Sequence, residues 1–179
     1  FRVVLEDFNP DRLLVLGDTN TGLLSIIARK NGVQVFHLEA GNRAYDETLP
    51  EEVNRRVIDA VAHYNLTYTE NSKGNLLREG YHRNGVFKVG NPIYEVIRSV
   101  SIPAHYGGHV IATFHRSNNV DVSDRLLGVL SALGQIAIER PVILSLHPRT
   151  KDQLRRQGYS VPANVVIKDG IGFLECLGL

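Results

Sequence analysis

Three carboxylates in the first third of the chain have the chemistry needed to move protons. Asp18 and Glu39 each follow a short apolar run, and Glu51 begins a segment with helical spacing. Carboxylates held beside a weakly acidic C–H group can act as general acids or bases. Asp18 could instead cap a helix, and Glu51 has capping-box spacing with Thr48. Glu39 has no such structural interpretation, because an unpaired carboxylate beside a buried strand is costly; His37, nearby, we interpret as a hydrogen-bonded core residue.

A second group of residues in the other half of the chain carries imidazole or positive charge. His115 and Arg116 follow one apolar run, and His147 follows another, before Pro148. Such side chains can hold a phosphorylated ligand. His147 could instead orient a loop. Together with the carboxylates they suit a phosphorylated substrate that undergoes proton transfer, but the residues alone predict only a cleft that binds an anionic ligand.

An alternating pattern of strands and helices would position both groups. Short apolar runs predict strands at residues 13–16, 33–38, 66–69, 86–89, 109–114, 142–146 and 165–167. Helical spacing predicts helices at residues 19–30, 49–64, 72–79, 123–139 and 150–157. Repeated strand–helix–strand units imply parallel sheets covered by helices, with ligands beyond the carboxyl ends of the strands. Asp18, Glu39, Asn91, His115, Arg116 and His147 all lie at such ends, whereas Glu51 lies in the predicted helix at 49–64.

The pattern weakens between residues 90 and 108, where prolines and glycines, Pro103 among them, interrupt it. We therefore predict two Rossmann-like domains, residues 1–100 and 101–179. A cleft between them would have acids on one wall and imidazole or guanidinium groups on the other. Both ends of the chain look cut, because it begins at Phe1 without a methionine and stops within the apolar run 171–179, which predicts an unfinished helix.

The composition argues against several classes of protein. The chain has 43% hydrophobic and 22% charged residues, which is ordinary for a globular protein. Its formal net charge is +1, so a nucleic-acid or membrane-surface partner is not expected. The single Cys176 excludes an intrachain disulfide and a multi-cysteine metal site. No segment has the length of a membrane span or the pattern of a secretory leader, so we expect a cytoplasmic protein. The absence of HExxH, CxxC and GxGxxG motifs predicts neither a metal nor a dinucleotide cofactor.

Two neighbouring motifs resemble the signature of the non-hydrolysing UDP-N-acetylglucosamine 2-epimerase family. Residues 37–43 read HLEAGNR, and residues 49–55 read LPEEVNR. Gly-Asp-Thr at 17–19, Gly-Asn-Pro at 90–92 and His-Arg at 115–116 follow the family in matching order, so the resemblance extends over essentially the whole chain. It implies the glycosyltransferase-B (GT-B) fold of two Rossmann-like domains, both of them incomplete in this chain.

The resemblance also implies a reaction and roles for particular residues. The family inverts C2 of UDP-N-acetylglucosamine to give UDP-N-acetylmannosamine, a precursor of cell-surface polysaccharides, by anti elimination of UDP and re-addition to a bound 2-acetamidoglucal. The residues that match its catalytic acids and catalytic histidine are Asp18, Glu39, Glu51 and His115. The implied substrate-binding residues are Arg55, Asn91, Arg116 and His147. The implied assembly is a homodimer without a cofactor.

The resemblance leaves other substrates and activities open. HLEAGNR followed by Tyr-Asp-Glu at 45–47 is also similar to 2-epimerases of UDP-N-acetyl-fucosamine-type or diacetamido-uronic acid sugars. A hydrolysing epimerase usually has Gly-Gly-Glu at the Glu-Ala-Gly position, and a GT-B glycosyltransferase or binding module would need fewer carboxylates. The family's Gly-Thr-Arg-Pro-Glu loop and its Ser-Gly-Gly segment are not within residues 1–179. We therefore predict that these 179 residues alone do not epimerise a sugar nucleotide.

Overall fold

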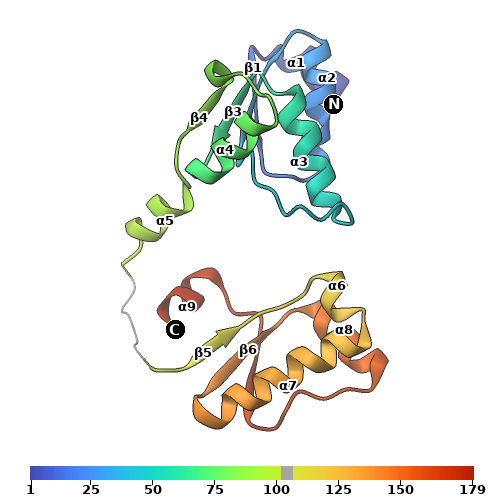
Figure 1. Ribbon diagram of the computed structural model, residues 1–179, viewed down its shortest axis with the longest axis vertical. Helices are drawn as coiled ribbons and strands as arrows, with labels where there is room; N and C mark the ends of the chain where they lie inside the picture. The colour runs from blue at the N-terminus through green and yellow to red at the C-terminus, as the bar shows by residue number, and fades with distance from the viewer. Residues whose placement is uncertain (102–106) are drawn as a thin grey trace. The chain divides into compact units, whose positions relative to one another are not determined.

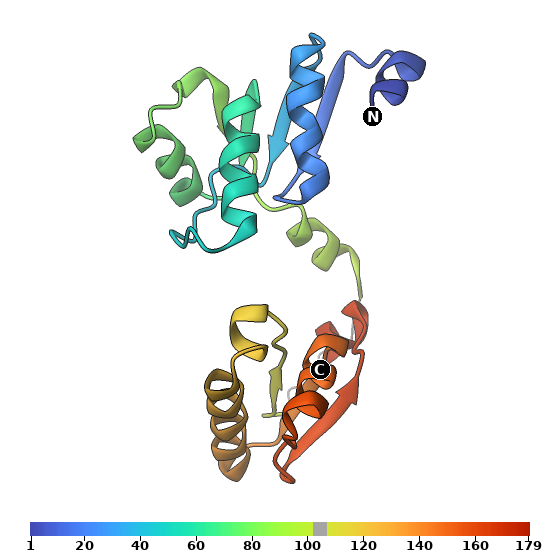
Figure 2. The ribbon, with the colours of Figure 1, turned by 90° about the vertical axis from the view of Figure 1, so that its right-hand side faces the viewer.

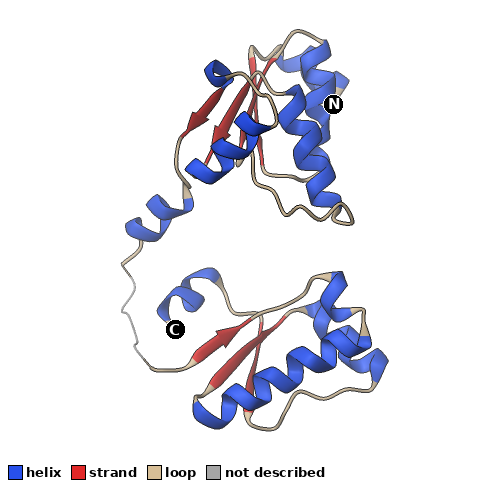
Figure 3. Ribbon diagram, viewed as in Figure 1, coloured by secondary structure: helices blue, strands red, loops and turns tan. Residues whose placement is uncertain are grey.

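The computed structural model describes residues 1–101 and 107–179, which divide into two compact units, Phe1–Ser99 and Val100–Leu179. Each unit carries its own parallel β-sheet with helices packed against it (Figure 1 and Figure 3). The predicted α/β fold with parallel sheets is confirmed. Pro103, one of the residues that predicted a domain junction, lies outside the described residues.

The first unit contains a four-stranded sheet in the order β1-β2-β3-β4, with every neighbouring pair parallel. The strands are β1 (Arg12–Leu16), β2 (Gln34–Leu38), β3 (Tyr64–Thr67) and β4 (Val86–Lys88). The α-helices are α1 (Arg2–Phe8), α2 (Ser25–Lys30), α3 (Pro50–Val61), α4 (Glu70–Arg78) and α5 (Ile93–Ser99). The 3-10 helices are η1 (Asn20–Leu24) and η2 (Arg83–Gly85). Because all strands run in one direction, their carboxyl ends meet at one edge of the sheet.

Helices cover one face of this sheet, and the other face is apolar and more exposed. Residues paired across parallel strands point to the same face. The covered face carries Val15, Val35, His37, Asn65 and Val86, all of them buried. The opposite face carries Leu14, Leu16, Phe36, Leu38, Tyr64, Leu66 and Phe87, none of them buried. Figure 2 shows α2 and α3 side by side against the strands, and Ala28 and Ile58 of these helices complete the core.

The second unit contains a three-stranded parallel sheet in the order β5-β6-β7. Its strands are β5 (Val110–Ala112), β6 (Val142–Leu146) and β7 (Val165–Asp169). Its helices are α6 (Ser117–Val120), α7 (Ser123–Glu139), α8 (Pro148–Gln157) and α9 (Phe173–Gly178). The core joins α7, α8 and the sheet through Leu126, Leu130, Leu133, Val142, Leu144, Leu146, Leu154 and Val165. The leucines of α7 recur every three or four residues, which turns one stripe of the helix toward the sheet.

Tertiary contacts displace several boundaries from those that the sequence predicts. The single helix predicted at 19–30 is divided into η1 and α2. Gly22 in η1 packs so closely against α3 that a Cβ there would lie 2.6 Å from Ile58 Cδ1. Helix α3 ends at Val61 instead of residue 64, because the next residues join the sheet. His63 exchanges hydrogen bonds with Val35, from its backbone N–H at 2.8 Å and to its Nδ1 at 3.0 Å.

Two helix starts differ from what the sequence pattern indicated. The stretch 90–108, where the pattern weakens, contains α5, whose first N–H, that of Ile93, is bound by the Asn91 side chain at 3.1 Å. Pro92, counted among the interruptions of the pattern, immediately precedes this helix. The capping box is absent from α3: its N-cap is Leu49, and the Thr48 hydroxyl donates instead to Asp46 at 2.6 Å.

Candidate active site

Two of the three predicted carboxylates, Asp18 and Glu39, lie in loops at the carboxyl edge of the first unit's sheet. Asp18 follows β1, Glu39 follows β2 and Asn91 lies beyond β4. Glu51 is exposed in the first turn of α3, one helical turn before Arg55. Parallel strands bring their carboxyl ends together, which is where open α/β sheets bind ligands.

Glu39 is held in a backbone conformation that non-glycine residues rarely adopt. Its φ is 76°, in the left-handed region, where a side chain costs roughly 1–2 kcal/mol. Two backbone bonds maintain it: the N–H groups of Glu39 and Ala40 both donate to the Leu66 carbonyl, at 3.1 and 3.2 Å. The half-buried carboxylate accepts a bond from Asn42 at 3.2 Å through Oε1, and its Oε2 lies toward Gly17. Strain of this kind persists only where surrounding contacts hold it, and it often marks a functional residue.

Glu39 and Asn91 line one polar pocket of about 400 Å³. The other lining residues are Asn42, Arg43, Tyr68, Thr69, Asn71, Ser72 and Asn75. Burial, and then the negative charge of Glu39, raise the pKa of Tyr68, so its phenol stays protonated near neutral pH. Amides and hydroxyls beside one carboxylate suit a ligand rich in hydroxyl and amide groups, such as a sugar.

Asp18 does not cap a helix: its carboxylate pairs with Arg55, and the two side chains are 25% and 13% exposed. Arg55 also binds Glu52, on the same helix, at 3.0 Å. The pair of Asp18 with Arg55 therefore ties the loop after β1 to α3. Asn54, on the same helix, donates to the Asp18 carbonyl at 2.9 Å. Asp18 and Arg55 are therefore brought together, with the Asp18 backbone fixed from α3.

A buried network of charges, not predicted from the sequence, lies beneath these loops. The Asp59 carboxylate is fully buried and accepts from His37 at 2.7 Å and from Arg43 at 2.8 Å. Arg43 also makes a two-bond pair with Glu79, at 2.7 and 2.6 Å. Burial opposes the charge of Arg43, but Glu79 and Asp59 outweigh it and raise the pKa of the guanidinium. A signal was present in the sequence, because Asp59 stands beside Ile58 on the core-facing side of an amphipathic helix.

His37 connects this network to the loop that carries Asp18. Its Nε2 lies 3.0 Å from the Gly17 carbonyl, and its Nδ1 faces Asp59. A carbonyl oxygen only accepts, and so does an ionised carboxylate. Both ring nitrogens of His37 therefore face oxygen atoms, and His37 holds the turn before Asp18 in place. The predicted role of His37 as a hydrogen-bonded core residue is confirmed.

In the second unit, the predicted residues lie at the ends of β5 and β6. The rings of His115 and His147 stack with centroids 4.5 Å apart and planes 22° from parallel. His147 also caps α8, its Nδ1 accepting from the Arg149 N–H at 3.1 Å. Arg116 is exposed at the start of α6. The two exposed imidazoles thus lie together in space, and Arg116 directly follows His115 in the sequence. Side chains of both kinds can bind an anion.

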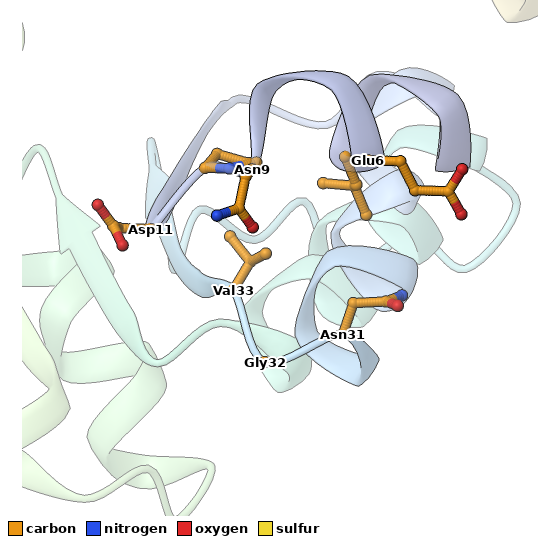
Figure 4. Close-up of a pocket in the computed structure, with 8 residues that line it drawn as sticks. Glu6, Asn9, Asp11, Asn31, Gly32 and Val33 are labelled. Atoms are coloured by element: carbon orange, nitrogen blue, oxygen red, sulfur yellow. The ribbon is translucent and has the colours of Figure 1, made fainter.

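A second cavity in the first unit, of about 440 Å³, lies away from these residues. It is lined by Glu6, Asn9, Asp11, Asn31 and other residues around the starts of β1 and β2 (Figure 4). Those are the amino ends of the strands, opposite the edge that carries Glu39. Within the described parts of the chain, no group of three His, Cys, Asp or Glu side chains could hold a metal ion, and no helix is long and apolar enough to span a membrane.

Comparison with known proteins places these features in a family. A family model described as UDP-N-acetylglucosamine 2-epimerase matches residues 1–179. A UDP-N-acetylglucosamine 2-epimerase of Methanocaldococcus jannaschii is 35% identical over 99% of this chain and 54% of its own length. A UDP-2,3-diacetamido-2,3-dideoxy-D-glucuronate 2-epimerase of Pseudomonas aeruginosa is also 35% identical, over 99% of this chain and 52% of its own. The chain thus spans about half the length of these relatives.

A solved structure agrees. The crystal structure of the M. jannaschii enzyme in complex with UDP-GlcNAc and UDP superimposes with a TM-score of 0.79, at 33% identity, over 97% of this chain and 53% of that one. The fold is therefore of the GT-B type found in sugar-nucleotide epimerases, and this chain holds about half of it. The chain belongs to the UDP-N-acetylglucosamine 2-epimerase family.

Proposed function

We propose that the chain is part of an isomerase that inverts C2 of a UDP-linked 2-acetamido sugar, UDP-N-acetylglucosamine in the first instance. The observation that carries this proposal is the strained Glu39, held on the wall of a polar pocket at the carboxyl edge of the sheet. The family membership and the relatives' names support the same reaction. The unit Phe1–Ser99 would belong to the N-terminal Rossmann-like domain, and Val100–Leu179 to the nucleotide-binding one.

In this proposal the carboxylates of the first unit move the proton at C2. A carboxylate takes the C2 proton, the C2–H electron pair forms the C1=C2 bond, and the C1–O pair leaves with UDP. Re-addition of UDP with proton delivery to the opposite face completes the inversion. One face loses a proton and the other gains one, so the mechanism uses more than one acid–base group. Asp18, Glu39 and Glu51 are the proposed groups, with Arg55 orienting Asp18.

The second unit supplies the proposed diphosphate contacts. His115 and Arg116 carry donors suited to phosphate oxygens, and His147 supports His115 by stacking. Charge that develops on the leaving diphosphate is stabilised by such donors more than the ground state is, which lowers the barrier. Asn91, on the wall of the Glu39 pocket, is the proposed amide contact to the sugar.

A second substrate has a specific observation in its favour. The relative named as a diacetamido-glucuronate 2-epimerase is as similar to this chain as the relative named for UDP-N-acetylglucosamine, at 35% identity. Assays with UDP-N-acetylglucosamine, UDP-N-acetyl-fucosamine-type and diacetamido-uronate sugar nucleotides distinguish these substrates by the ratio of their kcat/KM values.

The test of the reaction uses the full-length enzyme in deuterated water. We expect deuterium at C2 of the sugar nucleotide, and we expect Glu39→Gln to lower kcat by about 100-fold or more, because a positioned acid–base group contributes on that order. Glu139→Gln, at an exposed position at the end of α7, is the matched control and should keep wild-type activity. Full activity of Glu39→Gln would remove Glu39 from the mechanism.

Other products would identify the rival activities. Release of free N-acetylmannosamine would indicate a hydrolysing epimerase, and sugar transfer without deuterium at C2 would indicate a glycosyltransferase. We also propose a homodimer and a cytoplasmic location. Sedimentation of the full-length protein tests the first and cell fractionation tests the second.

A further inference from the structure

A directed series of hydrogen bonds ends at the Glu39 carboxylate. Thr69, the N-cap of α4, accepts from the Ser72 N–H at 3.0 Å, and the two hydroxyls lie 2.9 Å apart. The Ser72 hydroxyl donates to Asn42 Oδ1 at 2.7 Å, and Asn42 Nδ2 donates to Glu39 Oε1 at 3.2 Å. The single hydrogen of Ser72 is used on Asn42, so the Thr69 hydroxyl is the donor to Ser72. Every member of the series then has its donor and acceptor assigned.

The series determines which way the Asn42 amide faces. The two ends of an amide are similar in shape, but only the –NH₂ end can donate. With the Ser72 hydroxyl bound to Oδ1, the –NH₂ group faces Glu39. The reverse orientation would place the amide oxygen against a carboxylate oxygen, with no hydrogen between them. Ser72 is buried, so water does not readily replace its bond.

The backbone of the same loop is fastened to α4 in two further places. Gly41 approaches α4 so closely that a Cβ would overlap the Ser72 carbonyl oxygen, and the Gly41 carbonyl accepts from Asn75 at 2.9 Å. The residue before Asn42 is therefore bound to α4 through its backbone, and the Asn42 side chain is held by Ser72.

We propose that Asn42, oriented by Ser72, is a positioning residue that holds Oε1 of Glu39 and leaves Oε2 for proton transfer at C2. The inference rests on the proposed function and deepens it. The Asn42 N–H donor favours the ionised form of the Glu39 carboxylate. Holding Oε1 in place also restrains rotation of the carboxylate before the proton moves.

The other polar groups around Glu39 do not duplicate this contact. Arg43 lines the same pocket, but its guanidinium is engaged by Asp59 and Glu79. Tyr68 lines it with a protonated phenol. Asp18, which follows Gly17, adds a negative charge that Arg55 pairs. Asn42 is the residue whose hydrogen bond to the carboxylate is seen.

The test measures kcat, KM, the pH dependence of kcat/KM and C2 deuterium exchange in the full-length enzyme. For Asn42→Ala we expect kcat to fall about 10- to 100-fold with KM little changed, because small displacements of a reacting group have effects of this order. The limb of the pH profile governed by Glu39 should move to higher pH, since the charged form loses a donor. Asn42→Asp, which adds a like charge, should move it further.

Two controls separate positioning from folding. Asn84→Asp makes the same chemical change at an exposed position in η2, near the amino end of β4, and should leave kcat and the pH profile unchanged. Ser72→Ala should lower kcat less than Asn42→Ala, and the double variant should match Asn42→Ala, because Ser72 acts through Asn42. Thermal melting of each variant checks its fold.

The outcomes distinguish the inference from the function on which it rests. If the wild-type enzyme exchanges deuterium at C2 but Asn42→Ala keeps the wild-type kcat and pH profile, the positioning role of Asn42 is overturned and the proposed function is not. If the losses of kcat in Ser72→Ala and Asn42→Ala add up in the double variant, the inference that Ser72 acts through Asn42 is overturned. No C2 exchange by the wild type with any of the three sugar nucleotides would overturn both proposals.

Discussion

At the scale of single residues, Glu52 connects the candidate site to the buried charges. Its side chain is 2% exposed and accepts from the Ala44 N–H at 2.9 Å and from Arg55 at 3.0 Å. Arg56 binds its other oxygen at 3.1 Å. Burial alone would raise the pKa of Glu52, but these three donors outweigh burial and lower it. Glu52 is thus the carboxylate that ties Arg55, and through it Asp18, to the loop at Ala44.

We predict that Glu52→Gln destabilises the protein by about 1.5–3 kcal/mol at pH 7, the usual contribution of hydrogen bonds to a charged group. The pKa of Glu52 is lower in the folded protein than in the unfolded one, where it is near the ordinary glutamate value of 4.5. Its stabilising contribution is therefore complete above that value and is lost as the pH falls below it. Urea unfolding between pH 3 and pH 7 measures the difference.

The difference between wild type and Glu52→Gln should begin to narrow below about pH 4.5, where Glu52 of the unfolded chain takes up a proton, and it should close as the pH falls through the lower pKa of Glu52 in the folded protein. Glu47→Gln, at an exposed loop position, should match the wild type throughout. A difference that stays constant down to pH 3 would contradict the assignment of Glu52 as an ionised member of the network.

At the scale of elements, the turn after β2 carries most of the candidate site. Glu39 and Gly41 both have positive φ, 76° and 75°, so the chain bends sharply over the end of β3 and against α4. Gly41 N–H donates to both oxygens of Asp59, at 3.3 Å each. This turn thus joins β2, α3 and α4, and a change in its shape would move Glu39 and Asn42 together.

We predict that Gly41→Ala destabilises the protein much more than Gly80→Ala. Both glycines have positive φ, but a Cβ at position 80 meets no atom within 4 Å, whereas one at 41 meets the Ser72 carbonyl and Leu76. Conformational strain alone should give Gly80→Ala a loss of about 1–2 kcal/mol. The backbone overlap at 41 should add about 1–3 kcal/mol. Thermal or urea unfolding of the two variants compares them, and equal losses would show that the turn relaxes away from α4.

At the scale of the whole molecule, the chain consists of two units with separate cores. In the first, Val15, Val35 and Ile58 lie between the sheet and its helices. In the second, Leu130 and Leu144 belong to a core of their own. Stability is therefore a property of each unit, and a single unfolding free energy does not describe the chain.

We predict that Leu144→Ala, a fully buried change in β6, destabilises the second unit by about 2–5 kcal/mol. Hydrogen exchange should accelerate in β5–β7 and α7 and stay near wild type in β1–β4. Ile138→Ala, at a position 79% exposed on α7, is the control and should change neither unit. Equal acceleration in both sheets would show that the two cores unfold as one.

Local pattern predicted much of this architecture. Helix α7 and strand β6 lie within the predicted boundaries, because their apolar residues face one core with the spacing of a regular helix or strand. Most of the predicted site residues lie beyond strand ends, as parallel α/β topology requires, while Glu51 and Arg55 lie in α3. Prediction failed where a distant residue decided the outcome: Tyr64 leaves the predicted helix to stack on Phe36 in β2, with ring centroids 4.9 Å apart.

The sequence by itself determined the alternation of elements, the parallel sheets and the carboxylate, imidazole and guanidinium residues at their ends. Only the tertiary structure decided how those residues are paired. Arg43 binds Glu79, 36 positions away, and His37 binds Asp59, 22 positions away. Which buried charge meets which depends on strand register and helix packing, because a buried charge without a partner in contact carries an uncompensated desolvation cost. The sequence thus predicts which groups have the chemistry, and packing determines that Glu39 faces Asn42 and that Asp18 faces Arg55.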